Sequence, residues 1–267
     1  SWIDEFNDHA ECGFLYSGYK FVSDNPMDIY YSNPFDRYHL ECEPFIDGAS
    51  PYRRTNTVRW NEDLKSLIDW DWSLSLTDNG AKGFYIKEPL YFAEFPNPGG
   101  LSYDSSYNWI ERRKQIQKLH NIQTRNICLT SLIEPETALE IAKLIEVDFL
   151  NYPGFKPHEY DLIYQYGFMA TMDKIQASAG VFHKHWKHKV IHWIGKDILS
   201  LINMPWKDAD AFTQLALSKE AVNNWCMNNK EGSILRRMHL NPEIVIPPIK
   251  IPEQQEKLAA ISVNDDE

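Results

Sequence analysis

Four histidines lie within ten residues of one another, and three of them have the spacing of metal ligands on a helix. His185, His188 and His192 are three and four residues apart, so an α-helix would place their imidazole rings on one face. No HExxH arrangement and no suitably spaced carboxylate completes such a site, and the intervening lysines would repel a cation. The segment is therefore interpreted as a basic helix that faces solvent or phosphate, and no metal site is predicted.

Carboxylate pairs and short motifs indicate no catalytic site on this chain. Three acidic pairs lie in acidic surroundings and are interpreted as solvated surface: Glu41 and Glu43, Asp69 and Asp71, and Glu134 and Glu136. The sequence contains no GxxxxGK(S/T) or GxGxxG phosphate-binding motif and no GxSxG nucleophile motif. No catalytic residue is therefore predicted here.

Basic side chains are the candidates for contacts to nucleic acid, because lysine and arginine bind phosphates as point charges or bidentate forks. They are Arg112, Arg113, Lys114 and Lys118 on one expected helix, Lys184 and Lys187 in the histidine segment, and Arg236 and Arg237 on another expected helix. Met204, Pro205 and Trp206, followed by Lys207, form an apolar loop tip of the kind that wedges between bases. The alternatives are ordinary solvation of the helices and a packing role for Trp206.

Composition indicates a globular protein outside the membrane. The 267 residues are 43% hydrophobic and 13% aromatic, which supports a core and excludes a disordered chain. No apolar run approaches the roughly 18 residues of a membrane span, and the acidic start SWIDE lacks the apolar region of a signal peptide. Four scattered cysteines without a CxxC pair favour a reducing compartment. We expect a cytoplasmic protein (in the host cytoplasm, if viral) with no membrane partner.

The net charge of −11 argues against an autonomous DNA-binding protein with a basic face. Acidic side chains concentrate in the first third of the chain and in the last residues. The middle of the chain is nearly neutral and can still present a local basic surface.

The first hundred residues predict short strands and loops. Aromatic runs such as GFLYSGYKFV and GFYIKEPLYF alternate with turn-forming residues, and Asp78–Gly80 is expected to form a hairpin turn. The segment 61–72 predicts a short helix with Asn61 as its N-cap. The Pro/Gly-rich stretch 95–100 predicts a boundary.

Helical periodicity replaces this pattern from about residue 105. The expected helices cover 105–123, 135–150, 158–179, 181–202, 217–229 and 233–239, with Pro135 in the first turn of the second. After Pro242 two consecutive prolines predict an extended segment. The expected fold is therefore mostly α, with an irregular or small-β N-terminal third (1–100), a helical region (101–250) and an acidic flexible tail (251–267).

Several segments of the helical region resemble, in order, the N-terminal domain of single-subunit, phage-type DNA-dependent RNA polymerases. They are RNICLTS (125–131), ETALEIAKLIEVDF (136–149), GFMATMDKI (167–175), HKHWKHKVIHWIGKDILSLI (183–202), LSKEAVNNW (217–225) and PEIVIPPIKIP (242–252). In that family the catalytic aspartates, with their magnesium, lie beyond the double proline, here Pro247 and Pro248. The resemblance implies a non-catalytic small subunit of a split, heterodimeric phage RNA polymerase, which needs a larger palm-and-fingers subunit and contacts upstream DNA and the RNA–DNA hybrid.

The resemblance also implies a weakened ability to open promoters. The family's promoter-opening hairpin lies where this chain has only the short span 204–216, so a single-strand-binding helper protein is expected. The irregular aromatic leader would wrap the partner subunit. Two alternatives stay open: a structural or accessory protein of a phage or organelle assembly, and a stand-alone helical nucleic-acid-processing enzyme that depends on His185 or His188.

Overall fold

The structure, a computed structural model, contains two compact units. It describes residues 2–21, 29–30, 32–56, 58–93, 109–131, 134–151, 160–167, 188–194, 197–199, 203, 222–237, 240 and 242–247. The first unit comprises Ser1–Thr124 with Lys156–Glu159, and the second comprises Arg125–Phe155 with Tyr160–Glu267. The division between the units does not coincide with the boundary expected near residue 100. That stretch and the acidic tail, 251–267, lie outside the described residues.

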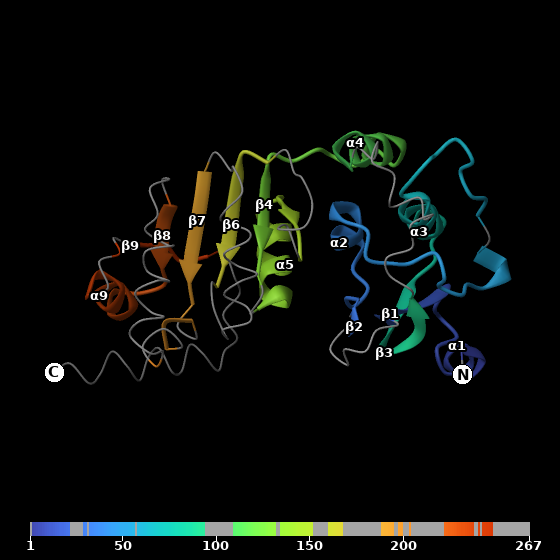
Figure 1. Cartoon of the computed structure of the whole chain (residues 1–267), viewed down its shortest axis with the longest axis horizontal. Coiled ribbons are helices and arrows are strands. Elements are labelled where there is room, and N and C mark those ends of the chain that lie inside the picture. Colours follow the sequence, from blue (N-terminus) through green and yellow to red (C-terminus); the bar gives the residue numbers. More distant parts are fainter. Residues whose placement is uncertain are drawn as a thin grey trace. The chain divides into compact units, whose positions relative to one another are not determined.

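The first unit contains a three-stranded sheet in the order β2-β1-β3. Its strands are β1 (Phe14–Phe21), β2 (Ile29–Tyr30) and β3 (Gly83–Ala93); β1 pairs antiparallel with β2 and parallel with β3. Its described helices are α1 (Trp2–Asp8), α2 (Arg37–Cys42), the 3-10 helix η1 (Arg54–Asn56), α3 (Ile68–Asp78) and α4 (Trp109–Leu119) (Figure 1). The strand predictions over the two aromatic runs are confirmed.

The central helix of this unit, α3, is buried on all sides. Five consecutive residues, 70–74, are buried, so the helix has no solvent face from which an amphipathic pattern would arise. It ends at Asp78, and Gly80, two residues later, has a φ of +83°, the left-handed conformation that commonly follows helix ends. The predicted hairpin turn at Asp78–Gly80 is therefore wrong, because these residues end a helix. The predicted helix from Asn61 is also wrong in its start: α3 begins at Ile68, and the Asn61 side chain accepts a hydrogen bond from the backbone of Asp63 at 3.2 Å.

The second unit is built on a six-stranded parallel sheet in the order β5-β4-β6-β7-β8-β9. The strands are β4 (Ile127–Thr130), β5 (Asp148–Phe149), β6 (Leu162–Tyr166), β7 (His188–Trp193), β8 (Val222–Cys226) and β9 (Pro242–Ile244). Helix α5 (Pro135–Leu144) packs on β4 and β5, and α9 (Asn229–Arg237) packs on β8 and β9 (Figure 1). Because parallel crossovers are right-handed, α5 and α9 lie on opposite faces of the sheet.

The mostly α prediction is wrong, since the fold is mixed α/β. The helices expected over 158–179, 181–202 and 217–229 contain β6, β7 and β8. Four of the five residues of β6 and five of the six residues of β7 are buried, so neither strand shows the alternation of buried and exposed residues that marks a half-exposed strand. The helices expected near 105–123 and 135–150 are confirmed as α4 and α5, and the extended start of 242–252 is confirmed as β9.

Within the described residues, no helix combines the length and apolar character required to cross a membrane.

Candidate ligand site at the carboxyl edge of the parallel sheet

The strand order of the second unit reverses between β4 and β6. From β4 the chain moves outward to β5, then returns past β4 to β6 and continues in the other direction to β9. In open parallel sheets such a reversal of strand order marks the crevice outside the carboxyl ends of the two strands, where ligands bind. We call the residues at and just after the carboxyl ends of β4, β6, β7 and β8 the carboxyl edge.

Two buried polar side chains lie side by side at this reversal. Thr130 is the last residue of β4 and is paired in register with Gln165 of β6, so both side chains point to the same face. The Gln165 amide is turned toward the strand end, because its Nε2 donates to the Gly167 carbonyl at 3.2 Å. Among the described residues, Thr130 Oγ1 and Gln165 Oε1 have no hydrogen-bond partner, although Thr130 is 1% and Gln165 0% exposed. Both atoms can accept a hydrogen bond from a ligand.

The backbone at the carboxyl edge is shaped by a glycine and two side-chain caps. Gly167 has a φ of +68°, which lets the chain turn away directly after β6, and its N–H donates to the His192 carbonyl at 2.8 Å. After β4, the Ser131 hydroxyl accepts the Glu134 N–H at 3.0 Å. After β7, one oxygen of the fully buried Asp197 accepts the backbone N–H groups of Ile194 and Ile198, at 2.9 and 2.8 Å.

Negative charge collects around Tyr166, the last residue of β6. Burial and the nearby carboxylates of Glu134, Asp197 and Glu231 raise the pKa of Tyr166 to about 12, so its phenol is a hydrogen-bond donor at neutral pH. Glu134 directly precedes α5, and Glu231 lies in the first turn of α9. Both helix N-termini therefore already carry a carboxylate, which disfavours a phosphate at either position.

The imidazole of His192 forms part of the sheet's aromatic core. Its Nδ1 lies 2.6 Å from the Tyr164 hydroxyl, and its ring packs edge-to-face against Tyr166 and Trp225. Burial lowers the pKa of His192 to about 4, although a hydrogen bond with the Val245 backbone raises it in part. The ring is therefore neutral at physiological pH. Because the pKa of Tyr164 is raised by burial, its hydroxyl donates and His192 Nδ1 accepts.

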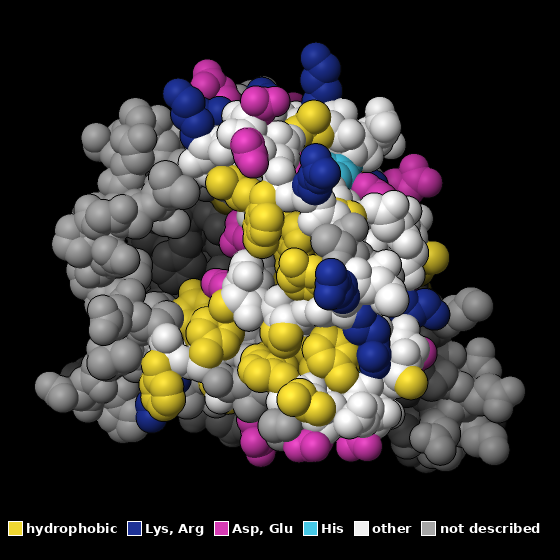
Figure 2. All heavy atoms as spheres, turned by 90° about the vertical axis from the view of Figure 1, so that its right-hand side faces the viewer, with side chains coloured by type: hydrophobic (Ala, Val, Ile, Leu, Met, Phe, Trp, Pro, Cys, Tyr) yellow, Lys and Arg dark blue, Asp and Glu magenta, His cyan; other side chains and the backbone are white. Residues whose placement is uncertain are grey.

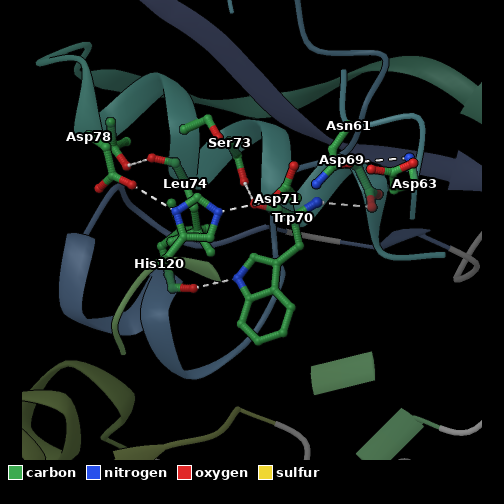
Figure 3. Close-up of polar contacts among 12 residues, drawn as sticks. Asn61, Asp63, Asp69, Trp70, Asp71, Ser73, Leu74, Asp78 and His120 are labelled. Atoms are coloured by element: carbon green, nitrogen blue, oxygen red, sulfur yellow. Dashed lines mark hydrogen bonds and ion pairs between the residues drawn. The ribbon is translucent and has the colours of Figure 1, made fainter. Parts of the chain in front are cut away.

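A second histidine, in the first unit, has the carboxylate partners of a catalytic residue but a structural role. His120 Nε2 lies 3.0 Å from Asp71 and its Nδ1 lies 2.7 Å from Asp78, so the ring joins the end of α4 to α3 (Figure 3). With both ring nitrogens occupied, no nitrogen is left to take a proton from a substrate. Asp71 was interpreted as solvated surface, and so was Glu43; both interpretations are wrong, because the two residues are 5% and 6% exposed.

The contacts of His120 with Asp71 and Asp78, which we call the His120 clamp, predict that the stability of the first unit depends on pH. Burial alone lowers the pKa of His120, but the hydrogen bonds and charges of Asp71 and Asp78 outweigh it and raise the pKa above its ordinary value. Such a group contributes its full stabilisation of the folded protein at pH values below its pKa in the unfolded chain, about 6.5. This stabilisation is lost as the pH rises through the pKa that the group has in the folded protein. We expect His120→Gln to cost about 1–3 kcal/mol below pH 6 and less above it, in urea unfolding measured across pH.

His9→Gln is the control for this prediction. His9 is a more exposed histidine with two glutamate neighbours, Glu5 and Glu11, at 3.9 and 3.6 Å. Its replacement should cost less than about 1 kcal/mol, because exposed ion pairs contribute little to stability. An unchanged slope in His120→Gln would contradict the clamp.

The basic residues expected to contact nucleic acid are divided between the two units where the structure describes them. On α4, Arg113 is buried and its Nη2 donates to the Cys42 carbonyl at 3.4 Å, so it supports the core of the first unit. Arg112 bonds Gln115 at 3.1 Å, while Lys114 and Lys118 are exposed. Arg236 and Arg237 are exposed at the end of α9, in the other unit. Six candidates lie outside the described residues: Lys184, Lys187, Met204, Pro205, Trp206 and Lys207.

The expectation that a helix places His185, His188 and His192 on one face is contradicted in the part of this segment that the structure describes. His188 and His192 lie in β7, where four residues span about 13 Å, so their rings are not neighbours as they would be on a helix. His188 is exposed and His192 is buried. His185 lies outside the described residues.

Sequence reasoning missed Thr130, Gln165, Tyr166 and Asp197. No motif connects them, because the sheet brings together strand ends that are far apart in the sequence. One signal was available: the hydroxyl residues Thr130 and Ser131 end a short apolar run shortly before a helix that starts with Pro135. A strand followed by a short loop and a helix is the unit from which parallel sheets are built.

Comparisons of the chain with protein-family models, with curated proteins and with solved structures gave no match.

Proposed function

We propose that the second unit binds a small molecule that presents hydroxyl or N–H groups to the carboxyl edge. The observation that carries this proposal is a pair of buried acceptors, Thr130 Oγ1 and Gln165 Oε1, that find no partner in the described part of the chain and lie at the point where the strand order reverses. A buried polar atom without a partner costs about 1–3 kcal/mol. Two such atoms on neighbouring strands favour a ligand that supplies the missing donors.

The charges at the carboxyl edge restrict the chemistry of this ligand. Carboxylates accept hydrogen bonds from hydroxyl and amine groups and repel phosphates. Glu134, Asp197 and Glu231 surround Tyr166 closely enough to affect its pKa. A neutral polyhydroxyl compound, such as a sugar or the ribose of a nucleoside, therefore fits better than a phosphate ester.

Replacing Thr130 with valine separates a ligand-binding role from a structural one. Valine has the same shape, so the change removes the buried hydroxyl without opening a cavity. We expect the unliganded protein to be as stable as the wild type or up to about 1 kcal/mol more stable, because no hydrogen bond is lost. Thermal unfolding with millimolar nucleosides, nucleoside diphosphates, monosaccharides and polyols should show a stabilising ligand for the wild type. Its affinity should fall at least tenfold in Thr130→Val.

Ile163→Val is the matched control. Ile163 lies on the same face of β6 as Gln165, two residues from it toward the amino end, and is fully buried. This variant should lose about 1 kcal/mol of stability and keep the wild-type ligand affinity. If Thr130→Val binds every stabilising ligand as tightly as the wild type does, the site is elsewhere.

The RNA-polymerase hypothesis stays a second proposal, supported by the order of the sequence segments between 125 and 252. Under it, the chain would be the non-catalytic subunit, and magnesium would be held by the larger partner. Purification of the tagged chain with its natural partners, followed by a template-dependent RNA synthesis assay, tests it. A stoichiometric partner and synthesis only by the pair would support the hypothesis, and a lone, inactive chain would contradict it.

We also propose a cytoplasmic location. All four cysteines, Cys12, Cys42, Cys128 and Cys226, are free and buried. Free thiols are typical of proteins in a reducing compartment.

A further inference from the structure

We propose that the first unit carries a carbohydrate-binding site, formed by the exposed rings of Trp60 and Tyr52 and by the polar groups beside Trp60. This site is separate from the carboxyl edge and does not depend on the function proposed for it. Figure 2 looks onto the first unit and shows hydrophobic side chains gathered on its face, with charged side chains around them. Trp60 and Tyr52 are 42% and 38% exposed, high values for aromatic side chains that also pack on the core.

Both exposed rings rest on one buried indole, Trp72. Trp60 stacks on Trp72 with ring centroids 5.0 Å apart and planes 11° from parallel, and Tyr52 meets Trp72 edge-on, also at 5.0 Å. Trp72 is fully buried in the core of the first unit. Because one face of Trp60 is covered by a fixed ring, its orientation is set before any ligand arrives. Preorganised rings lose little conformational entropy on binding.

The chain next to Tyr52 is held equally firmly. The Arg53 side chain donates to the backbone carbonyl of Cys12 at 2.8 Å and to those of Phe6 and His9. Its guanidinium also lies 4.8 Å from the centre of the Phe6 ring. These contacts tie the segment that carries Tyr52 to α1 and the start of β1.

Gly48 lies beside the edge of the Trp60 ring. A methyl group built on Gly48 would lie 3.5 Å from Trp60 Cη2 and 3.5 Å from Asp69 Cβ, and Gly48 itself is exposed. The ring edge and the stem of Asp69 thus flank a position that glycine leaves open. Figure 3 shows Asn61, Asp63 and Asp69 close together beside the start of α3.

This combination of groups matches the two surfaces of a sugar ring. One face of a pyranose carries C–H groups with partial positive charge, which are attracted to the negative face of an indole. Its edge carries hydroxyl groups, which donate hydrogen bonds to carboxylate and amide oxygens such as those of Asp63, Asp69 and Asn61. The carboxylates disfavour phosphate, and so argue against single-stranded nucleic acid, the main competing occupant, even though the exposed Arg59 precedes Trp60.

The test is a titration of the full chain with neutral soluble oligosaccharides (gluco-, chito-, galacto- and manno-oligosaccharides) and with a single-stranded ten-nucleotide thymidine oligomer. Calorimetry or tryptophan fluorescence reports binding. We expect at least one oligosaccharide to bind in the micromolar to millimolar range. Trp60→Ala should weaken it at least tenfold.

A second variant keeps the test decisive if Trp60→Ala does not fold. Gly48→Leu removes no binding group, but its side chain would cover the edge of the Trp60 ring beside Gly48, so it should also weaken binding at least tenfold. Phe92→Ala is the control, because Phe92 is more exposed, at 73%, and lies outside the stack on Trp72. Thr130→Val, which alters the other unit, should bind the oligosaccharide normally.

Three results would overturn the proposal. The first is that no oligosaccharide binds. The second is that an oligosaccharide binds equally well to the wild type, Trp60→Ala and Gly48→Leu. The third is that the oligonucleotide binds, no sugar does, and Trp60→Ala abolishes the oligonucleotide binding. Loss of oligosaccharide binding in Thr130→Val alone would place the sugar at the carboxyl edge, which supports the proposed function and contradicts this inference.

Discussion

Asp148→Ala is expected to destabilise the second unit by about 3–5 kcal/mol. Asp148 is fully buried in β5, where one carboxylate oxygen lies 3.0 Å from Arg125 Nη1 and the other accepts the Tyr160 hydroxyl at 2.5 Å. Alanine would leave the Arg125 guanidinium, in a side chain only 12% exposed, without its carboxylate. Removing one partner of a buried ion pair is costly because the remaining charge stays desolvated.

Urea unfolding followed by far-UV circular dichroism measures this loss. Asp148→Asn keeps an acceptor for Tyr160 and removes only the charge, so it should be less destabilised than Asp148→Ala. Glu140→Ala breaks the exposed pair on α5, in which Lys143 Nζ lies 2.8 Å from the carboxylate, and should change stability by less than about 1 kcal/mol. Equal losses in Asp148→Ala and Glu140→Ala would mean that the buried network does not stabilise the sheet.

Trp72→Ala is expected to destabilise the first unit by about 3–5 kcal/mol, because it removes a fully buried indole from the core. The phenylalanine variants give a sharper comparison. Trp70 and Trp72 lie two residues apart on α3 and both are 0% exposed. Trp70 Nε1 donates to the Leu40 carbonyl at 2.6 Å, whereas the buried Trp72 Nε1 has no hydrogen-bond partner among the residues that the structure describes.

Trp70→Phe should therefore cost about 1–3 kcal/mol more than Trp72→Phe. Both variants lose a similar volume, but only Trp70→Phe leaves a buried carbonyl without its donor. In Trp72→Phe the removal of an unsatisfied N–H offsets part of the packing loss. Denaturant unfolding of the two variants under one set of conditions gives the difference directly, and a larger loss in Trp72→Phe would refute the assignment of these contacts.

The sequence predicted those helices that have an exposed face. Around α5, Pro135 and Glu136 mark the start as expected. The apolar stripe expected at Leu139, Ala142, Ile145 and Phe149 is only partly right, because α5 buries Ala138, Ile141 and Ala142 and leaves Ile145 40% exposed. On α3 the same reasoning failed in its boundaries, because a helix buried on all sides has no polar face and the turn signal at Gly80 is shared by helix ends and hairpins.

The strands of the parallel sheet were missed for a physical reason. Val190, Ile194 and Ile198 fit an i, i+4 helical stripe, yet only the first of them lies in β7. A short apolar run buried on both faces has no period of its own, and its neighbours decide its structure. Thr130 and Gln165 show the same limit for the site: their proximity comes from the register of β4 with β6, which local sequence does not encode.

The parallel pairing of β1 with β3 has a consequence for the order in which the protein is made. Phe14 is in register with Gly83, and α2, η1 and α3 lie between the two strands in the sequence. During translation β1 leaves the ribosome long before the strand that pairs with it. Contacts of such high sequence separation form slowly, because a long loop must close before they contribute free energy. Until then the aromatic side chains of β1 are exposed on the nascent chain, and a chaperone that binds apolar segments can bind them.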